Sequence, residues 1–184
     1  ALTTALADWI ERVRVRAIND VPYAVRDADG VLDLAWMFAA YVNEDHPLVE
    51  KVLKDALESG IVDRFDGYQS GDPGQVYRQV FAIWNVLQRR GIRYSAIQRT
   101  SSVDDAVLSQ HVRFLDESWD NGQANCVDGS VLLASLLRKI GIEPILVMVP
   151  GHCYLAFWLD REGKQIAALE TTLLTHGLPP PEGL

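Results

Sequence analysis

Cysteine is scarce in this chain, whose 184 residues include only Cys126 and Cys153. Two cysteines form one bridge at most, which excludes a scaffold held together by disulfides. No residues near them have the spacing of zinc ligands. A chain of this length buries enough apolar surface to fold without such cross-links. We therefore expect neither a bound metal nor a cofactor.

Long apolar runs are also missing. The longest internal stretch without Asp, Glu, Lys or Arg, 144–159, is interrupted by Pro150, Gly151 and His152. It falls short of the ~18 apolar residues that a membrane-spanning helix needs, so we expect no membrane insertion. The chain begins at Ala1 without a signal-peptide pattern. A cytoplasmic protein, a periplasmic protein and a piece of a longer chain all stay open.

Clusters of basic residues are absent as well. The net charge is −8, and the densest group is Arg12, Arg14 and Arg16. Nucleic-acid binding needs a basic surface that releases counterions, so we expect no nucleic-acid partner. With 48% hydrophobic and 23% charged residues, the composition is that of an ordinary globular protein. The length predicts a single domain over 1–184, with a helical N-terminal lobe at about 1–100 and a core at about 101–178.

The first third of the chain is helical in character, and two further helices are predicted in the middle third. The apolar segment 31–42 predicts a buried helix, and Asp45 predicts the cap of a second helix that ends before Gly60. Asp72 followed by Pro73 predicts the start of a third, which Gly91 ends. Two further segments are less regular. Alternation over 12–21 predicts a strand, and the serines at 101 and 102 predict a short helix that runs towards Gln110.

The last third predicts a polar loop, a helix and three strands, in that order. The loop covers 116–125, and a strongly apolar helix then begins at Cys126 and ends before Gly141. Short apolar runs at 145–149, 152–159 and 165–171 are separated by turn residues, which favours an antiparallel meander. A central helix packed on consecutive strands is an α+β arrangement.

Cys126 is the residue whose position bears most directly on function. A thiol at a helix N-terminus meets the positive end of the helix dipole and unpaired N–H groups, both of which favour the thiolate. The backbone N–H of Cys126 is itself able to donate to an oxyanion. The alternative interpretation is a buried structural cysteine, a common environment for this residue type.

His152 and Glu170 extend the pattern beyond the cysteine. His152 opens the second predicted strand, and Glu170 lies near the end of the third. A strand that packs across the helix start brings an imidazole to the thiol, as a thiolate–imidazolium pair requires. A carboxylate on the adjacent strand then fixes the ring through its second nitrogen. The order Cys, His, Glu therefore predicts a catalytic triad.

The residues around this triad resemble a known family. The runs 125–129 (NCVDG), 149–152 (VPGH) and 169–172 (LETT), with leucine pairs between the first two, are similar to the bacterial branch of the transglutaminase-like proteins. The resemblance covers 110–175. It implies a papain-like core with a cysteine, histidine and acidic triad that works by thiol acylation. Two residues differ from the common pattern, since Ala124 stands where many such sequences have glycine and Glu170 replaces the commoner aspartate.

The resemblance also suggests residues around the reacting carbonyl. Gln110 is the candidate second oxyanion donor, because such sequences often carry a glutamine before a basic and apolar run. Asn125 and Gln123 compete for that role, and Trp119 is the tryptophan expected to line a cleft. The short interval between Cys126 and His152 leaves little room for the loops of animal cross-linking enzymes, which favours a hydrolase or a small acyltransferase.

Three functions therefore stay open at this stage. The leading hypothesis is a cysteine enzyme, a protease, amidase or acyltransferase, that acts on an amide or peptide bond of a protein or peptide substrate. The second is a catalytically weak or inactive binding or scaffold module of the same fold. The third is a redox role for Cys126 with Cys153, which the lack of a Cys-x-x-Cys pair disfavours. Substrate and oligomeric state do not follow from the sequence.

Overall fold

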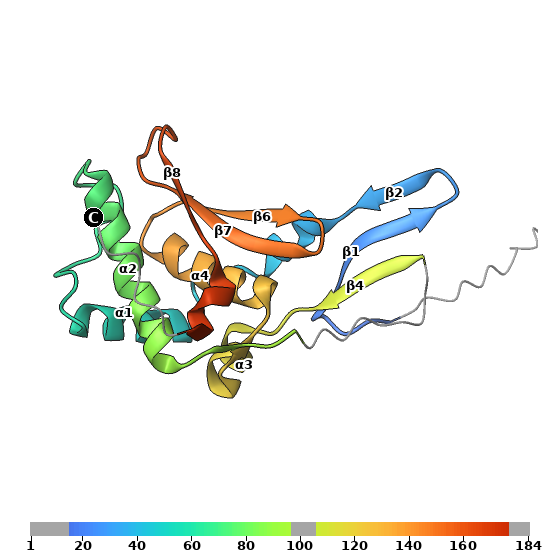
Figure 1. Ribbon diagram of the computed structural model, residues 1–184, viewed down its shortest axis with the longest axis horizontal. Helices are drawn as coiled ribbons and strands as arrows, with labels where there is room; N and C mark the ends of the chain where they lie inside the picture. The colour runs from blue at the N-terminus through green and yellow to red at the C-terminus, as the bar shows by residue number, and fades with distance from the viewer. Residues whose placement is uncertain (1–14, 97–105, 177–184) are drawn as a thin grey trace, which may run out of the picture.

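The computed structural model describes residues 15–96 and 106–176, which form helices and mostly antiparallel strands (Figure 1). The helices are η1 (Ala35–Tyr41), α1 (Pro47–Glu58), α2 (Pro73–Arg90), α3 (Leu115–Asn121), α4 (Cys126–Lys139) and η2 (Thr171–His176). The strands are β1 (Asp20–Asp27), β2 (Gly30–Asp33), β3 (Arg93–Tyr94), β4 (Val107–His111), β5 (Gln123–Ala124), β6 (Pro144–Val149), β7 (His152–Trp158) and β8 (Ile166–Leu169). The predicted α+β class is confirmed.

Three sheets organise the strands. Strands β6, β7 and β8 form the predicted antiparallel meander, while β2, β1 and β4 form a second antiparallel sheet. Strands β3 and β5 make a short parallel pair. In Figure 1 the β2-β1-β4 sheet projects away from α1 and α2, whereas the meander lies over α4.

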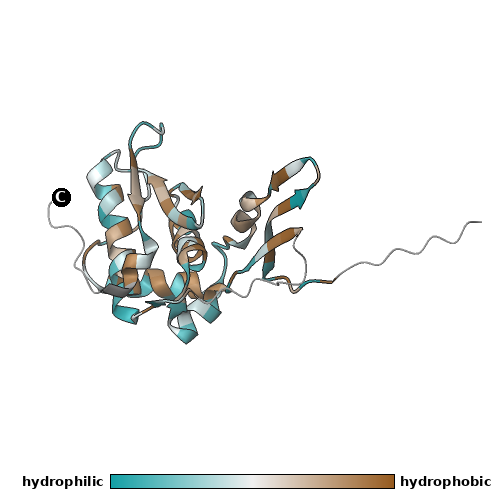
Figure 2. Cartoon of the chain, turned by 45° about the vertical axis from the view of Figure 1, so that its right-hand side comes forward, coloured by the Kyte–Doolittle hydropathy of each residue, from teal (hydrophilic) through white to brown (hydrophobic). Residues whose placement is uncertain are grey.

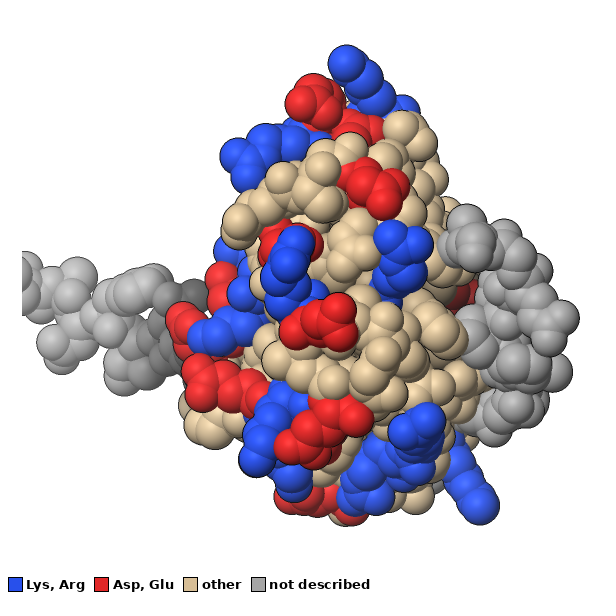
Figure 3. Space-filling view, turned by 90° about the vertical axis from the view of Figure 1, so that its left-hand side faces the viewer, with Lys and Arg blue, Asp and Glu red and all other residues tan. Residues whose placement is uncertain are grey.

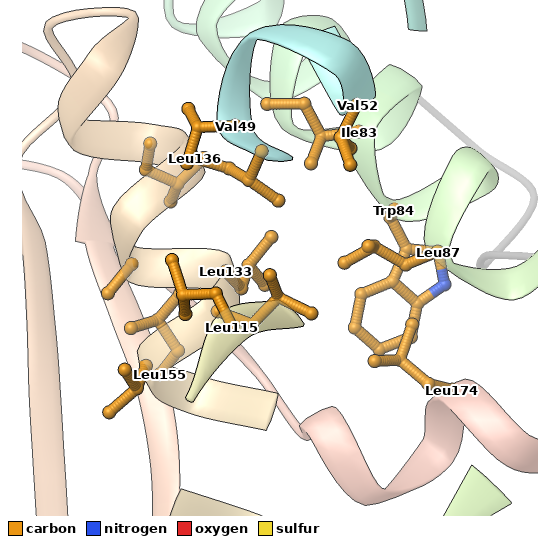
Figure 4. Packing of buried hydrophobic residues seen from close by; sticks show 14 of the residues in the cluster. Val49, Val52, Ile83, Trp84, Leu87, Leu115, Leu133, Leu136, Leu155 and Leu174 are labelled. Carbon is orange, nitrogen blue, oxygen red and sulfur yellow. The ribbon is translucent and has the colours of Figure 1, made fainter. Parts of the chain in front are cut away.

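Helix α4 is the centre of the core. It contacts β6 and β7 on one side and α1, α3 and η2 on others. Figure 4 shows Leu133 and Leu136 of α4 facing Val49 of α1 and Leu155 of β7, with Leu87 of α2 nearby. Almost every residue of α4 is buried, as expected for a helix enclosed by other elements. The packing of these elements around α4 therefore fixes the position of its first residues.

The predicted boundaries of α2 are confirmed. Asp72 caps it by accepting from the Gly74 N–H at 2.8 Å, Pro73 is its first residue, and Gly91 ends it in the left-handed conformation. Helix α1 lies where expected, but His46 rather than Asp45 is its cap. These helices depend on local cap chemistry, which the sequence displays directly.

The prediction of a buried helix over 31–42 is wrong. Its first residues form β2, which pairs with β1, and the helix that follows, η1, is short and of the 3-10 type. The cause is the preceding turn, where Asp27 Oδ1 accepts from the N–H groups of Asp29 and Gly30. Once this hairpin turn forms, the apolar run is divided between a strand and a helix.

Two more segments differ from prediction. Strand β4 occupies 107–111, where a helix towards Gln110 was expected, and the serines at 101 and 102 lie outside the described residues. Helix α3 occupies much of the expected loop, 116–125, because Glu117 accepts from the Phe114 N–H and Gly122 ends it. The strand expected at 12–21 begins only at Asp20. Residues 12–14 of that segment are not described.

Polar and apolar residues separate clearly on the outer helices. Figure 2 shows hydrophilic colour on the outward turns of α1 and α2 and hydrophobic colour towards the interior. On the face in Figure 3, acidic and basic side chains alternate without a broad patch of either sign. Within 15–96 and 106–176, no helix is long and apolar enough to cross a membrane.

Candidate active site at the start of helix α4

The start of α4 is fixed by a reciprocal cap. Asn125 Oδ1 accepts from the Asp128 N–H at 2.9 Å, and Asp128 Oδ2 accepts from the Asn125 N–H at 2.9 Å. This capping box satisfies two donors at the helix start. Cys126 is the first helical residue, so its thiol lies beside N–H groups that the helix itself leaves unpaired.

The thiol of Cys126 is largely buried. Burial raises the pKa of the Cys126 thiol, and the backbone N–H groups of Cys153, Val127 and Cys126 itself oppose this rise without cancelling it. The expected stabilisation of the thiolate is therefore present in geometry, but desolvation outweighs it in the free protein.

His152 and Glu170 meet as predicted. His152 Nε2 donates to Glu170 Oε2 at 2.6 Å, and Thr172 donates to Glu170 Oε1 through its N–H at 3.0 Å and its hydroxyl at 2.7 Å. Burial tends to raise the pKa of Glu170, but the hydrogen bonds from His152 and Thr172 outweigh it and hold the pKa below its ordinary value. The ionised carboxylate thus orients the ring and leaves Nδ1 on its other side.

Thr171 anchors this carboxylate segment to α4. Its hydroxyl donates to the carbonyl of Cys126 at 3.4 Å and lies 3.4 Å from Ser130 Oγ. The close approach is possible because Gly129 has no side chain, since a Cβ there would lie 3.0 Å from Thr171. The residue next to Glu170 is therefore packed on the first turn of the helix that carries Cys126.

One cavity of about 410 Å³ brings three of the predicted residues together. Cys126 lines it from the helix start, His152 from the start of β7, and Gln110 from β4. The opposite wall is the β1–β2 hairpin, through Val31 and Asp33 among others. Glu170 is not among the lining residues and acts from behind the ring. Among the described residues, the imidazole is hydrogen-bonded to Glu170 and not to Cys126 Sγ.

Gln110 has an unusual environment. It is 8% exposed, and its side-chain Nε2 is buried without a hydrogen-bond partner among the described residues. An unpaired buried amide is costly in a folded protein. The residue itself lines the same cavity as Cys126, which makes its amide a candidate donor to a carbonyl oxygen bound there.

A buried ion pair holds Gln110 in register with Cys126. Asp128 Oδ2 accepts from Arg113 Nη1 at 2.7 Å, and Asp128 Oδ1 accepts from the Arg113 N–H at 2.8 Å. Arg113 follows β4 by two residues, so the strand that carries Gln110 is attached to the first turn of α4. The sequence analysis missed both partners. The spacing Asn125-x-x-Asp128, which is that of a capping box, signals the role of Asp128 in the cap but not its pairing with Arg113.

Two predicted site residues have other roles. Asn125 is 2% exposed, and its side chain is committed to the helix cap and, at 3.5 Å, to the carbonyl of His111. Trp119 lies in α3 and is buried, with the cations of Lys51 and Arg90 near its ring, and it is not among the residues that line the cavity. Both residues support the fold around the site instead of facing a ligand.

Cys153 is separated from the cavity although it neighbours His152. It is 1% exposed and faces the core. Burial raises the pKa of its thiol to about 11.

No group of three or more His, Cys, Asp or Glu that could hold a metal ion occurs in the described part of the chain.

Gln123, the third candidate oxyanion donor, lies in β5 and is exposed. It lines a different hollow, together with Arg93 and Asp120.

Comparison of the chain with models of known protein families, with curated proteins and with solved structures finds no significant match in any of the three.

Proposed function

We propose that the protein is a cysteine-dependent enzyme that acts on an amide or peptide bond through a thioester, with a transglutaminase-like, papain-type core. The observation that carries this proposal is the cavity lined jointly by Cys126, His152 and Gln110, with Glu170 bonded to the far side of the imidazole. A nucleophile, a base and an amide then surround one space, with an orienting carboxylate behind the base. These are the parts that acyl transfer requires.

In the acylation step, Cys126 Sγ attacks the carbonyl carbon of the substrate while His152 accepts the thiol proton. The carbonyl oxygen becomes an oxyanion, for which the Cys126 N–H and Gln110 Nε2 are the donors. When the C–N bond breaks, His152 returns the proton to the departing amine. The product is a thioester on Cys126 and a free amine.

The second step returns the enzyme to its starting state. Water or an amine attacks the thioester carbon, His152 takes its proton, and the C–S bond breaks to release an acid or a new amide. The thiolate that leaves regains the proton from the imidazole. Because the pKa of Cys126 is raised in the free protein, His152 serves as a general base during attack rather than as the partner of a preformed thiolate.

Hydroxylamine trapping tests the proposal directly. The probes are benzyloxycarbonyl-Gln-Gly and casein, each incubated with the protein and hydroxylamine, and the products are followed by mass spectrometry. A thioester gives a hydroxamate, and its formation should disappear in Cys126→Ala and fall roughly 10²–10⁴-fold in His152→Ala. Cys153→Ala is the matched control and should keep activity. Equal product with Cys126→Ala would contradict the proposal.

One observation favours the alternative of a binding module without efficient turnover, namely the raised pKa of Cys126. The rate of alkylation by iodoacetamide distinguishes the enzyme from the binding module. In the enzyme, Cys126 should react faster than Cys153, because only Cys126 lines the cavity and Cys153 has a pKa of about 11. The rate at Cys126 should also fall in His152→Ala. An alkylation rate of Cys126 that is the same in the wild type and in His152→Ala, together with no hydroxamate formation, would support the binding module.

A further inference from the structure

A second hollow of about 480 Å³ adjoins the candidate site. The two spaces share Ala35 of η1 and Met148 of β6 as lining residues. The hollow is also lined by Trp36 of η1, Leu146 of β6 and Ala134 of α4. A ligand that reaches Cys126 can therefore continue past Met148 into this space.

The register of β6 and β7 explains why the hollow is apolar. Leu146 and Met148 lie opposite Leu155 and Cys153, so all four project from the same face of the sheet. On β7 this face is buried, and β7 packs on α4. On β6 the face extends to the sheet edge, where Met148 is 36% exposed. The apolar face of the sheet thus extends from the core to β6, where Leu146 and Met148 line the hollow.

The rim of the hollow carries an exposed tryptophan. Trp36 is 70% exposed, whereas Phe38 of the same short helix is buried in the core. Other exposed apolar residues of the two spaces are Val31, Met148 and Val149. A contiguous exposed apolar surface next to a reactive group is typical of a ligand-binding groove.

The charged residues around the hollow are paired with each other and do not call for a charged ligand. Glu44 and Arg138 line it, but they bond each other at 2.8 Å, so neither needs a ligand charge. In the adjoining cavity Asp33 is the lining carboxylate. An uncharged apolar group is the chemistry that fits the hollow.

We propose that this hollow is a specificity subsite that binds an apolar side chain, of leucine or phenylalanine type, from a peptide whose carbonyl lies at Cys126. The placement of the carbonyl rests on the proposed function, but binding in the hollow does not require turnover. Trp36 and Met148 cover the side chain, and its transfer from water supplies the affinity. Trp36 is then a binding residue that the sequence motif around Cys126 does not reveal.

The test measures binding to the Cys126→Ala protein by titration calorimetry, so that it is independent of catalysis. The probes are N-acetyl tripeptide amides of glycine in which each position in turn carries Leu, Phe, Asp or Lys. At one position Leu and Phe should bind roughly tenfold to hundredfold more tightly than Gly, the value expected for a buried apolar side chain. Asp should show no gain.

Variants test whether the preference for Leu and Phe peptides arises in the hollow. Trp36→Ala should lower the affinity of the Leu and Phe peptides roughly tenfold, and Ala39→Trp, which fills the hollow, should abolish their advantage over Gly. Tyr94→Ala is the control, because Tyr94 is an exposed aromatic residue that lines neither space. It should leave binding unchanged.

The outcomes separate this inference from the proposed function. Apolar preference that Trp36→Ala removes, together with no turnover in the wild-type protein, supports the subsite and overturns the enzyme. Turnover without any apolar preference, or with a preference that Trp36→Ala and Ala39→Trp leave intact, overturns the subsite and keeps the enzyme. Failure of all peptides to bind Cys126→Ala at millimolar concentration overturns the subsite.

Discussion

The two walls of the candidate active site are built very differently. On the α4 wall, Cys126 is buried and Asp128 behind it is 1% exposed, with both of its carboxylate oxygens hydrogen-bonded. On the opposite wall, every residue of β2 is exposed, and Val31 is 65% exposed. The candidate nucleophile is thus held by the core, whereas the exposed residues of β2 on the facing wall bury little surface. Such a division lets one wall change without unfolding the other.

Removing the carboxylate behind Cys126 should have the largest effect. Asp128→Ala leaves Arg113 with an unpaired charge that is only 12% exposed and deprives the α4 cap of its partner. Loss of one member of a buried pair costs about 3–5 kcal/mol of the free energy of unfolding. Urea denaturation measures this value. Asp45→Ala, which breaks an exposed pair with Lys139, is the control and should have a far smaller effect, because solvent screens such a pair. Equal losses would show that the α4 wall is not specially stabilised.

A smaller loss is expected from Gly129→Ala. The added Cβ would lie 3.0 Å from the side chain of Thr171, and overpacking of this kind costs about 1–3 kcal/mol. In the double variant Gly129→Ala with Thr171→Gly the clash is gone, so the two changes should show a favourable coupling of about 1 kcal/mol or more. Thermal unfolding of the four proteins gives the coupling. Strict additivity would mean that the segment after Glu170 is not packed on α4 as described.

The Glu170 carboxylate should make stability depend on pH in the acid range. Its folded-state pKa lies below the ordinary value of 4.5, so its contribution is present above that value and is lost as pH falls through the lower folded-state pKa. The difference in stability between the wild type and Glu170→Gln should shrink as the pH falls below the ordinary value of 4.5. Glu162→Gln, a change in an exposed turn, serves as control. A difference that grows on acidification would contradict the assigned direction.

The elements predicted well from the sequence are those whose determinants are local. Asp72 and Gly91 are the caps that delimit α2, and the apolar run after Cys126 delimits α4. The approach of His152 to Glu170 also followed from sequence, because neighbouring strands of a meander place their ends together. In these cases a short stretch of chain contains the physical cause of its own structure.

The errors concern pairing between distant segments. Strand β4 was taken for the end of a helix because its partner, β1, lies some ninety positions earlier in the chain. The interaction between Arg113 and Asp128 and the contact of Thr171 with Gly129 are likewise visible only after folding. Trp119 was assigned to a cleft because a polar loop was expected around it, whereas α3 turns it into the core.

The smallest effects on stability are expected on the hairpin wall, and there the two walls can be compared most sharply. Val31→Ser and Leu32→Ser both alter exposed residues of β2, so each should change the free energy of unfolding by less than about 0.5 kcal/mol. Only Val31 lines the cavity. Calorimetric titration of the Cys126→Ala background with the apolar tripeptide amides should therefore detect weaker binding for Val31→Ser and none of that loss for Leu32→Ser. Both side chains are apolar, exposed and on the same strand. A difference in peptide binding between the two variants therefore shows which of the two side chains faces the cavity. Equal losses would mean that the hairpin acts through its stability, and the separation between a structural wall and a substrate wall would then fail.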